Sequence, residues 1–443
     1  MMFNKICNFF QKKTTWLYNN SLVLQRIDDV ILPFILLTFV VSTFMSSDAI
    51  GFFAIIVMFL TIVKMFTKPN SKYEFQGFEI WLILYFMLVV VSLFGSTLFA
   101  QSLKGFCKTF IYIGFYFSTA LYIKDNLKKI PVILGTIALC TMMEGLIGVF
   151  QSTLHLEAIS TWQDTTNLNP EDILSRVYGT LKPLNPNLYG GYLIGGLPIV
   201  LGGIFYFLNK HKINMAILSC AASAAVIYAI LQTGCRGAYL SMLIIFFACF
   251  VLSAKFFWNK YKQIYLFLIG STVCLMTMVL IFVSSLRHRF LSIFAMRSDS
   301  SNSFRFNVYH SSLEMFKDNW LLGIGVGNKN FREIYGLYMK TGFDALSAYN
   351  IYLETAVESG IFALIAFLCF LGTVSYKAIK AIYNLENKEH IIYLSTCIIA
   401  IFGILFHGLV DTIYFRPQLQ FIFWTYIAVI CALLPQKTIN KNN

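Results

Sequence analysis

The chain of 443 residues has little charge: charged residues make up only 12% of it, whereas hydrophobic residues make up 58%. Its mean hydropathy of +0.69 lies far above that of water-soluble globular proteins. Apolar runs follow one another from end to end and leave no room for a large polar domain. The shortage of charge therefore excludes a soluble globular enzyme and indicates a protein embedded in a membrane.

The patterns that mark disulfide-bonded or metal-binding proteins are also missing. Most of the ten cysteines fall within apolar runs, and only Cys235 lies in a predicted outer loop, so the sequence shows no disulfide framework. The outer loops hold no Asp-x-Asp pair and no His/Cys cluster with metal-ligand spacing. We therefore expect no metal and no other cofactor. The lysines near the N-terminus precede no small-residue cleavage site, which favours a retained anchor over a cleaved signal peptide.

Apolar runs are what the sequence has in abundance, and each can cross a hydrocarbon layer of about 30 Å as a helix. Twelve runs are predicted: 30–46, 48–63, 78–98, 106–123, 131–150, 188–208, 214–232, 238–254, 263–285, 351–375, 391–409 and 418–434. We expect an all-α polytopic membrane protein of about 12 transmembrane helices, with a single transmembrane domain at 30–434. Short cytoplasmic segments, 1–29 and 435–443, flank this domain, and a large extracytoplasmic loop joins spans nine and ten.

The distribution of basic residues predicts the orientation in the membrane. With both termini in the cytoplasm, 20 of the 34 lysines and arginines fall in the N-terminal segment, the C-terminal segment or the short inner loops. The outer loops, although much longer, hold the other 14. This bias agrees with the positive-inside rule, which applies to short loops. We expect a multi-pass membrane protein with both termini cytoplasmic.

Lysine and arginine are distributed differently across the predicted membrane. Nineteen of the 25 lysines lie inside, but eight of the nine arginines lie outside: Arg176, Arg236, Arg287, Arg289, Arg297, Arg305, Arg332 and Arg416. Orientation needs only positive charge, so the outer arginines require another explanation. A guanidinium binds phosphate or carboxylate oxygens with two hydrogen bonds at once. The pattern indicates a bound polyanion, most simply a diphosphate, although each arginine alone is equally well explained by an ion pair or a lipid headgroup.

Two predicted outer loops are long, 151–187 and 286–350. In the second, residues 302–319 have apolar side chains at helical spacing and Ser303 as an expected cap, and residues 328–339 are predicted to form a second short helix. Such helices would lie on the outer membrane surface and cover a cavity. The glycines between them, Gly323, Gly325 and Gly327, favour a tight turn over a nucleotide-binding loop, because no strand precedes them.

Several acids lie near the outer ends of predicted spans. Glu354 and Glu358 are four residues apart on one helix face, as are His407 and Asp411, and Glu144 lies in the fifth run. Acids within spans face a cavity or pair with a cation. Ion pairing with outer arginines such as Arg416 explains these positions about as well as catalysis does.

Two segments, "FRFNVYHSSLEMFKDNWLLGIGVGNKNF" and "SAYNIYLETAVESGIFALIAF", resemble the hallmark region of the O-antigen ligase and polymerase family of bacterial inner membranes. The stretch "TGCRGAYLSML" resembles that family's short arginine-bearing outer loop. "RVYGTLKPLNPNLYGGYL", "GFDALSAYNIYLE" and "HGLVDTIYFRPQLQFIFW" are closest to cyanobacterial members described as bicarbonate transporters. The resemblance covers about residues 170–430.

The resemblance implies a twelve-span fold with a large outer loop over a cavity. It also implies metal-independent transfer of a glycan from an undecaprenyl diphosphate carrier to a hydroxyl acceptor. Under this hypothesis Arg236 and Arg305, with Arg176, hold the diphosphate, and Tyr349 and Asn350 orient the acceptor. The expected partners are a lipid-linked glycan donor, a lipid, glycan or protein acceptor and membrane lipid, with no nucleic acid.

The sequence departs from the family at the proposed acceptor site. The family's His-Asn, nine residues and Gly-x-x-Gly correspond here to Tyr349, Asn350, nine residues, Gly360 and Ala363. Since a tyrosine with a pKa near 10 is a poor base at neutral pH, His310, Glu354 or another acid is expected to take the role of the base. Two alternatives remain at this point: a transporter of a small anion such as bicarbonate, and a family member without catalytic activity.

Overall fold

The structure, a computed structural model, describes residues 2–45, 47–69, 71–156, 176–295 and 299–435. Arg297 and much of the predicted loop 151–187 lie outside the described residues. The chain is an all-α polytopic membrane protein, as expected, and no strand occurs in the part of the chain that is described. Nine helices there are long and apolar enough to cross a membrane, and two shorter apolar helices accompany them.

The main helices follow the predicted runs closely. They are α3 (Ile27–Phe44), α4 (Ser47–Thr67), α5 (Glu79–Gly95), α6 (Phe99–Asp125), α7 (Ile130–Thr153), α8 (Pro186–Asn209), α9 (Ile213–Gln232), α10 (Arg236–Phe282), α14 (Ile351–Asn384), α15 (Lys388–His407) and α16 (Pro417–Leu433). Two boundaries differ from expectation. Helix α6 begins early enough to include Lys104 and Lys108, and α14 continues beyond the predicted end of its run at residue 375 to Asn384.

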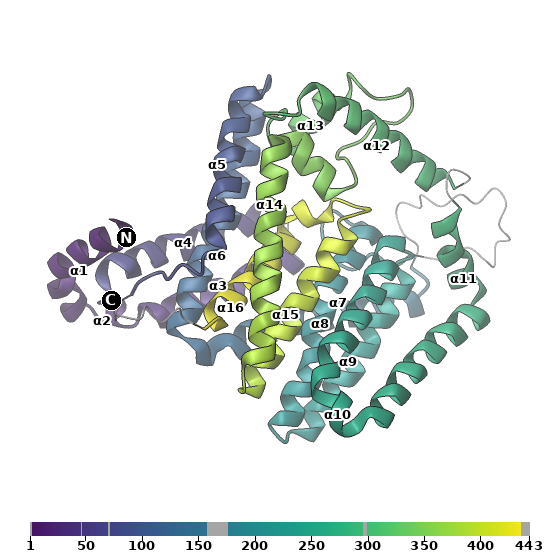
Figure 1. Ribbon diagram of the computed structural model, residues 1–443, viewed down its shortest axis with the longest axis horizontal. Coiled ribbons are helices and arrows are strands. Elements are labelled where there is room, and N and C mark those ends of the chain that lie inside the picture. Colours follow the sequence, from purple (N-terminus) through teal and green to yellow (C-terminus); the bar gives the residue numbers. More distant parts are fainter. Residues whose placement is uncertain (1, 46, 70, 157–175, 296–298, 436–443) are drawn as a thin grey trace.

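Runs eight and nine share one helix, α10, which is interrupted at Tyr261, where the backbone leaves the helical conformation. Figure 1 shows α10 turning back at its lower end and rising again toward α11 (Ser284–Leu291). The ring of Tyr265 packs against Phe250 across this bend, with 6.3 Å between ring centroids. The two halves of α10 therefore form a hairpin, and the predicted count of about twelve spans stays a prediction.

Helix α16 forms the centre of the bundle. Nearly all of its residues are buried, including Phe421, Trp424 and Tyr426. A helix that is apolar on all sides is expected in such a position. Its neighbours are α6 and α15, and Tyr426 donates a hydrogen bond to the carbonyl of Gly195 in α8 over 2.9 Å. This core fixes the ends of several helices relative to one another.

The outer loop is largely helical, as predicted. It contains α11, a short η3 turn (Ser292–Phe294), α12 (Ser300–Asp318) and α13 (Asn328–Tyr335). The expected cap was wrong: the cap of α12 is Asp299, four residues before Ser303, and its side chain accepts a hydrogen bond from the Asn302 amide. In Figure 1, α11, α12 and α13 lie along the upper right of the bundle, whereas α1 (Met2–Asn20) and the bend of α10 lie at its left and lower ends.

Candidate active site

A cavity of about 980 Å³ lies where the outer loop meets the helix bundle. Its walls come from α4, α6, α8, α10, α11, α12, α13 and α16 and from the connections before α8, α14 and α16. Five of the eight predicted outer arginines line it, together with one lysine: Arg176, Arg236, Arg289, Arg305, Arg416 and Lys108. The lining contains only two acids, Asp344 and Asp411. The cavity is therefore strongly cationic.

Contacts with the backbone hold two of these arginines in place. The Nε of Arg176 donates to the carbonyl of Thr233 over 2.7 Å, and its Nη2 donates to the Asn187 side chain over 2.7 Å. The Nε of Arg289 donates to the carbonyl of Gly234 over 2.8 Å. Both arginines thus attach to the turn that connects α9 to α10. Their positions are fixed before any ligand binds.

Arg236 and Arg305 are only partly satisfied. The Nη1 of Arg236 contacts Asp299 over 2.9 Å, and the Nη1 of Arg305 donates to the Ser301 hydroxyl over 3.3 Å. The Nη2 of Arg236 and the Nε of Arg305 are buried and find no acceptor among the residues that the structure describes. Because a buried N–H without an acceptor costs about 1–3 kcal/mol, these groups favour an anionic ligand that supplies oxygen atoms.

The electrostatics of the outer connections are consistent with an anion site. Burial lowers the pKa of the Arg176 guanidinium, and the charges of Arg236 and Arg305 act in the same direction. Burial also lowers the pKa of Arg289, and the charge of Arg176 adds to this effect. Arginine nevertheless stays charged in proteins. The cavity therefore concentrates positive charges that repel one another and that a polyanion would neutralise.

Helix ends add to this positive potential. Pro186, Arg236 and Pro417 are the first residues of α8, α10 and α16, Ser301 is the second residue of α12, and all four line the cavity. The N-terminus of a helix carries roughly half a positive charge and free N–H groups. The folding of the bundle thus directs several helix dipoles at the space that the arginines surround.

Tyr349 and Asp411 also line the cavity. Tyr349 precedes α14 and has a left-handed backbone with φ of 51°. Burial raises the pKa of its phenol, and the nearby Asp411 carboxylate raises it further. Tyr349 is therefore a protonated hydroxyl at neutral pH rather than a base. Asp411 is buried, and its Oδ1 accepts a hydrogen bond from the Thr412 amide over 2.7 Å.

Three predicted site residues do not line the cavity. Asn350 caps α14 by accepting from the amides of Tyr352 and Leu353, and it donates to the carbonyl of Leu409 over 3.0 Å. Glu354 is buried and accepts from the Ala348 amide over 2.9 Å. His310 is exposed on α12. The structure thus gathers Arg176, Arg236, Arg305 and Tyr349 but leaves these three outside.

The expected pairing of the outer acids with Arg416 is absent from the described residues, where Asp411 and Arg416 form no ion pair. Instead, Glu144 accepts from the Thr180 amide over 3.1 Å. His407 Nε2 lies 3.5 Å from the sulfur of Cys235. Sequence reasoning did not name Lys108 as a site residue, and it noted Arg289 and Asp411 only as members of the outer arginines and outer acids. For Arg289, the arginine-rich stretch that begins the outer loop was the available signal.

The outer loop is attached to the bundle by its glycine-rich centre, residues 323–327. The amides of Ile324 and Gly325 donate to the carbonyls of Val357 and Glu358 over 3.0 and 2.9 Å. Those carbonyls are available because α14 is interrupted at Gly360, whose φ of 82° is unfavourable for other residues. The Glu358 carboxylate accepts from the Gly327 amide over 2.8 Å. The predicted turn is thus confirmed, and Glu358 serves to hold it.

Comparison with known protein families gives a match over part of the chain. Residues 221–368, about a third of the chain, match the sequence model of the O-antigen ligase family. This segment runs from α9 to α14 and contains Arg236, Arg289, Arg305 and Tyr349. No match was found among curated proteins. This match over residues 221–368 supports the O-antigen ligase family.

Proposed function

We propose that this protein transfers a glycan from an undecaprenyl diphosphate carrier to a hydroxyl acceptor at the outer face of a bacterial inner membrane. Its O-antigen ligase domain supports a ligase- or polymerase-like role in polysaccharide assembly. The observation that carries the finer proposal is the cavity lined by five arginines, two of which have buried N–H groups without an acceptor. In this proposal both termini lie in the cytoplasm.

The arginines bind the diphosphate of the donor. Arg236 and Arg305 supply the unsatisfied donors, and Arg176, already fixed by Thr233 and Asn187, supports them. Negative charge builds up on the diphosphate as its bond to the sugar breaks. Preorganised cations that stabilise such charge in a water-poor site are a large contribution to catalysis.

The apolar part of the lining suits the lipid of the donor. Ile111 and Tyr112 of α6 and Phe421 of α16 line the cavity on the side toward the bundle, and Lys108 lies one turn from Tyr112. A prenyl chain would pack against these side chains by the hydrophobic effect, while its diphosphate would reach Lys108 and the arginines. The cavity thus offers neighbouring surfaces for the two chemically different parts of one molecule.

Asp411 is the group best placed to act as the base. It lines the cavity, unlike Glu354 and His310. In the proposed step the acceptor oxygen attacks the anomeric carbon, and a new C–O bond forms as the bond between sugar and diphosphate breaks. The acceptor proton passes to the Asp411 carboxylate, and undecaprenyl diphosphate leaves within the arginine cluster. The Tyr349 hydroxyl orients the acceptor by a hydrogen bond.

The test is turnover of lipid-linked glycan in membranes that contain the wild-type protein. We expect release of undecaprenyl diphosphate to depend on the protein and to be unchanged by a metal chelator. Bicarbonate uptake by the same strain, with and without the gene, tests the transporter alternative. Normal glycan turnover after deletion, together with lost bicarbonate uptake, would contradict the proposal.

A further inference from the structure

The N-terminal helix α1 lies outside the bundle and is attached at one point, the end of α4. The Nε2 of Gln11 donates to the carbonyl of Met65 over 2.8 Å and to that of Ser71 over 3.2 Å. The hydroxyl of Thr14 donates to the carbonyl of Phe66 over 2.7 Å. The last carbonyls of a helix have no partner within the helix. Side chains of α1 therefore complete the end of α4.

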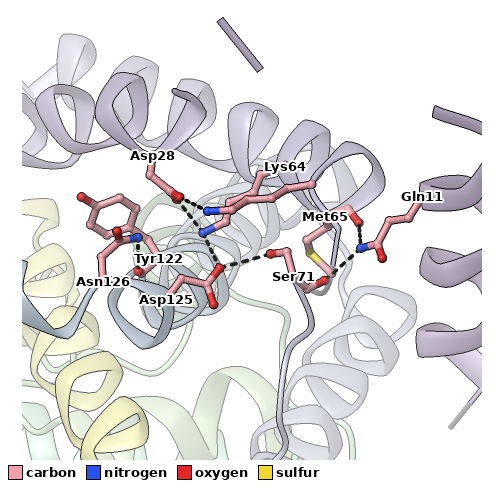
Figure 2. A network of polar contacts seen from close by, with 9 residues as sticks. Gln11, Asp28, Lys64, Met65, Ser71, Tyr122, Asp125 and Asn126 are labelled. Atoms are coloured by element: carbon pink, nitrogen blue, oxygen red, sulfur yellow. Dashed lines mark hydrogen bonds and ion pairs between the residues drawn. The ribbon is translucent and has the colours of Figure 1, made fainter. Parts of the chain in front are cut away.

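A network of buried charges reinforces this attachment, as Figure 2 shows. The fully buried Lys64 lies 2.7 Å from Asp28 and 2.7 Å from Asp125, so it connects α4 to α3 and α6. Ser71, whose carbonyl binds Gln11, also donates from its hydroxyl to Asp125 over 3.3 Å. The position of α1 is thereby fixed relative to three helices of the bundle.

The outward face of α1 is apolar and aromatic. Trp16 is 73% exposed and Phe9 is 55% exposed; they are seven residues apart and lie on one side of the helix. Leu22, in the short α2 (Leu22–Gln25), is 78% exposed. Nothing in the described part of the chain covers these side chains, although Gln11 and Thr14 attach the helix to the end of α4.

The charged side chains in the N-terminal segment that contains α1 are all positive. Residues 1–27 contain four basic residues and no acid. Lys12 and Lys13 are exposed, and the Nζ of Lys13 lies 4.5 Å from the centre of the Phe9 ring. Basic side chains thus lie beside an aromatic face, the combination typical of helices that lie in the plane of an anionic membrane surface.

The location of α1 also agrees with a membrane surface. It contacts α4 at the end where Asp28, Lys64, Lys68 and Asp125 gather, and charged clusters mark the polar boundary of a spanning bundle. In Figure 1, α1 lies at the left of the molecule, whereas α11 and α12 lie at its right. In the proposed topology the N-terminal segment lies in the cytoplasm.

We propose that α1 is an interfacial helix that binds anionic lipid headgroups of the cytoplasmic leaflet. Phe9, Trp16 and Leu22 insert below the headgroups, and Lys12 and Lys13 pair with lipid phosphates. Each lysine near an anionic surface favours the bound state by about fivefold. The contact is separate from the cavity, so it does not depend on the glycan transfer proposed above.

The test uses the full-length protein in nanodiscs whose lipids carry brominated acyl chains, which quench nearby tryptophans. The difference between the wild type and Trp16→Phe isolates Trp16 from the other five tryptophans. We expect strong quenching of Trp16 in discs of phosphatidylglycerol and weaker quenching in discs of phosphatidylcholine. The double variant Lys12→Glu, Lys13→Glu should reduce quenching in phosphatidylglycerol to the phosphatidylcholine level.

The matched control is Lys128→Glu with Lys129→Glu, which changes the charge equally at the connection before α7. It should keep the wild-type quenching. The proposal is overturned if Trp16 is not quenched in either lipid, or if both double variants behave alike. Crosslinking of two copies through a cysteine placed at Trp16, with no quenching, would instead show that a second copy covers this face. Gln11 and Thr14 are unchanged in every variant, so the attachment to α4 is preserved.

Discussion

The guanidinium carbon of Arg305 lies 5.9 Å from the centre of the Tyr349 ring. This contact joins α12 to the start of α14, and the Tyr309 hydroxyl reinforces it by donating to the Tyr349 carbonyl over 3.2 Å. A cation at this distance from an aromatic ring is attracted to its face. The residue that replaces the family histidine therefore positions an arginine of the proposed diphosphate site.

This relationship predicts the effect of changing Tyr349. Tyr349→Phe keeps the ring beneath Arg305 and loses a hydrogen bond worth about 0.5–1.5 kcal/mol, so glycan turnover should fall tenfold or less. Tyr349→Leu loses the ring as well and should be more damaging. Tyr349→His should be tolerated, because the family that the chain resembles has histidine at this position. Because the raised pKa keeps the phenol protonated, the pH–rate profiles of the wild type and Tyr349→Phe should coincide near neutral pH. A displaced profile would contradict this role.

Arg236→Lys and Arg305→Lys should each lower turnover on the order of 10² or more, because lysine keeps the charge but loses the forked geometry. Arg287→Lys is the control. Arg287 also lies in the outer loop, but it donates to the carbonyl of Ile281 over 2.8 Å and does not line the cavity. Wild-type turnover in both cavity variants, with normal amounts of protein in the membrane, would exclude the diphosphate site.

Asp411→Asn should lower turnover by about 10² to 10⁴, the usual range for loss of a positioned base. His310→Ala and Glu354→Gln should cost much less, since neither residue lines the cavity. All three variants are compared in the same membranes. If Glu354→Gln or His310→Ala is the most damaging, the base is the residue suggested by the sequence and not Asp411.

Asn350 is expected to act mainly through stability. It accepts from two amides at the start of α14, and loss of such a cap costs about 1 kcal/mol. Asn350→Ala should therefore lower the thermal midpoint, and Asn350→Ser, which keeps an acceptor, should restore most of the loss. An unchanged midpoint with lost turnover in Asn350→Ala would show that Asn350 contacts the acceptor directly.

Topology is tested by labelling with a membrane-impermeant thiol reagent in a cysteine-free background. His310→Cys lies on α12, and Glu386→Cys lies in the connection between α14 and α15; both positions are exposed. We expect His310→Cys to be labelled in intact cells and Glu386→Cys only after permeabilisation. The reverse pattern would invert the proposed orientation.

The fold was largely predictable because spanning helices need long apolar runs, and such runs are visible in a sequence. The outer-loop helices were predictable from their periodicity. The capping residue of α12 was not predictable, because "SDSSNS" offers several residues able to cap and only tertiary contacts decide among them. Asp299 is selected since it also pairs with Arg236.

The site was predictable in composition but not in arrangement. The segregation of arginine from lysine pointed to the cationic cavity before any fold was known. Which acid faces that cavity depends on the relative positions of α10, α12 and α14 and of the segment after α15. Glu354 and Asp411 have similar sequence signals, yet the first binds the Ala348 amide and the second lines the cavity.

The glycine-rich centre of the outer loop, residues 323–327, packs closely against the backbone of α6 and α14. A side chain at Gly105 would collide with the carbonyl of Val326, and one at Gly323 would collide with the backbone of Glu358. The turn is thus a fixed joint between α12 and α13, whose side chains Met315 and Tyr335 share one buried cluster with Val357 of α14. A residue larger than glycine at position 105 or 323 would therefore displace this joint from α6 and α14.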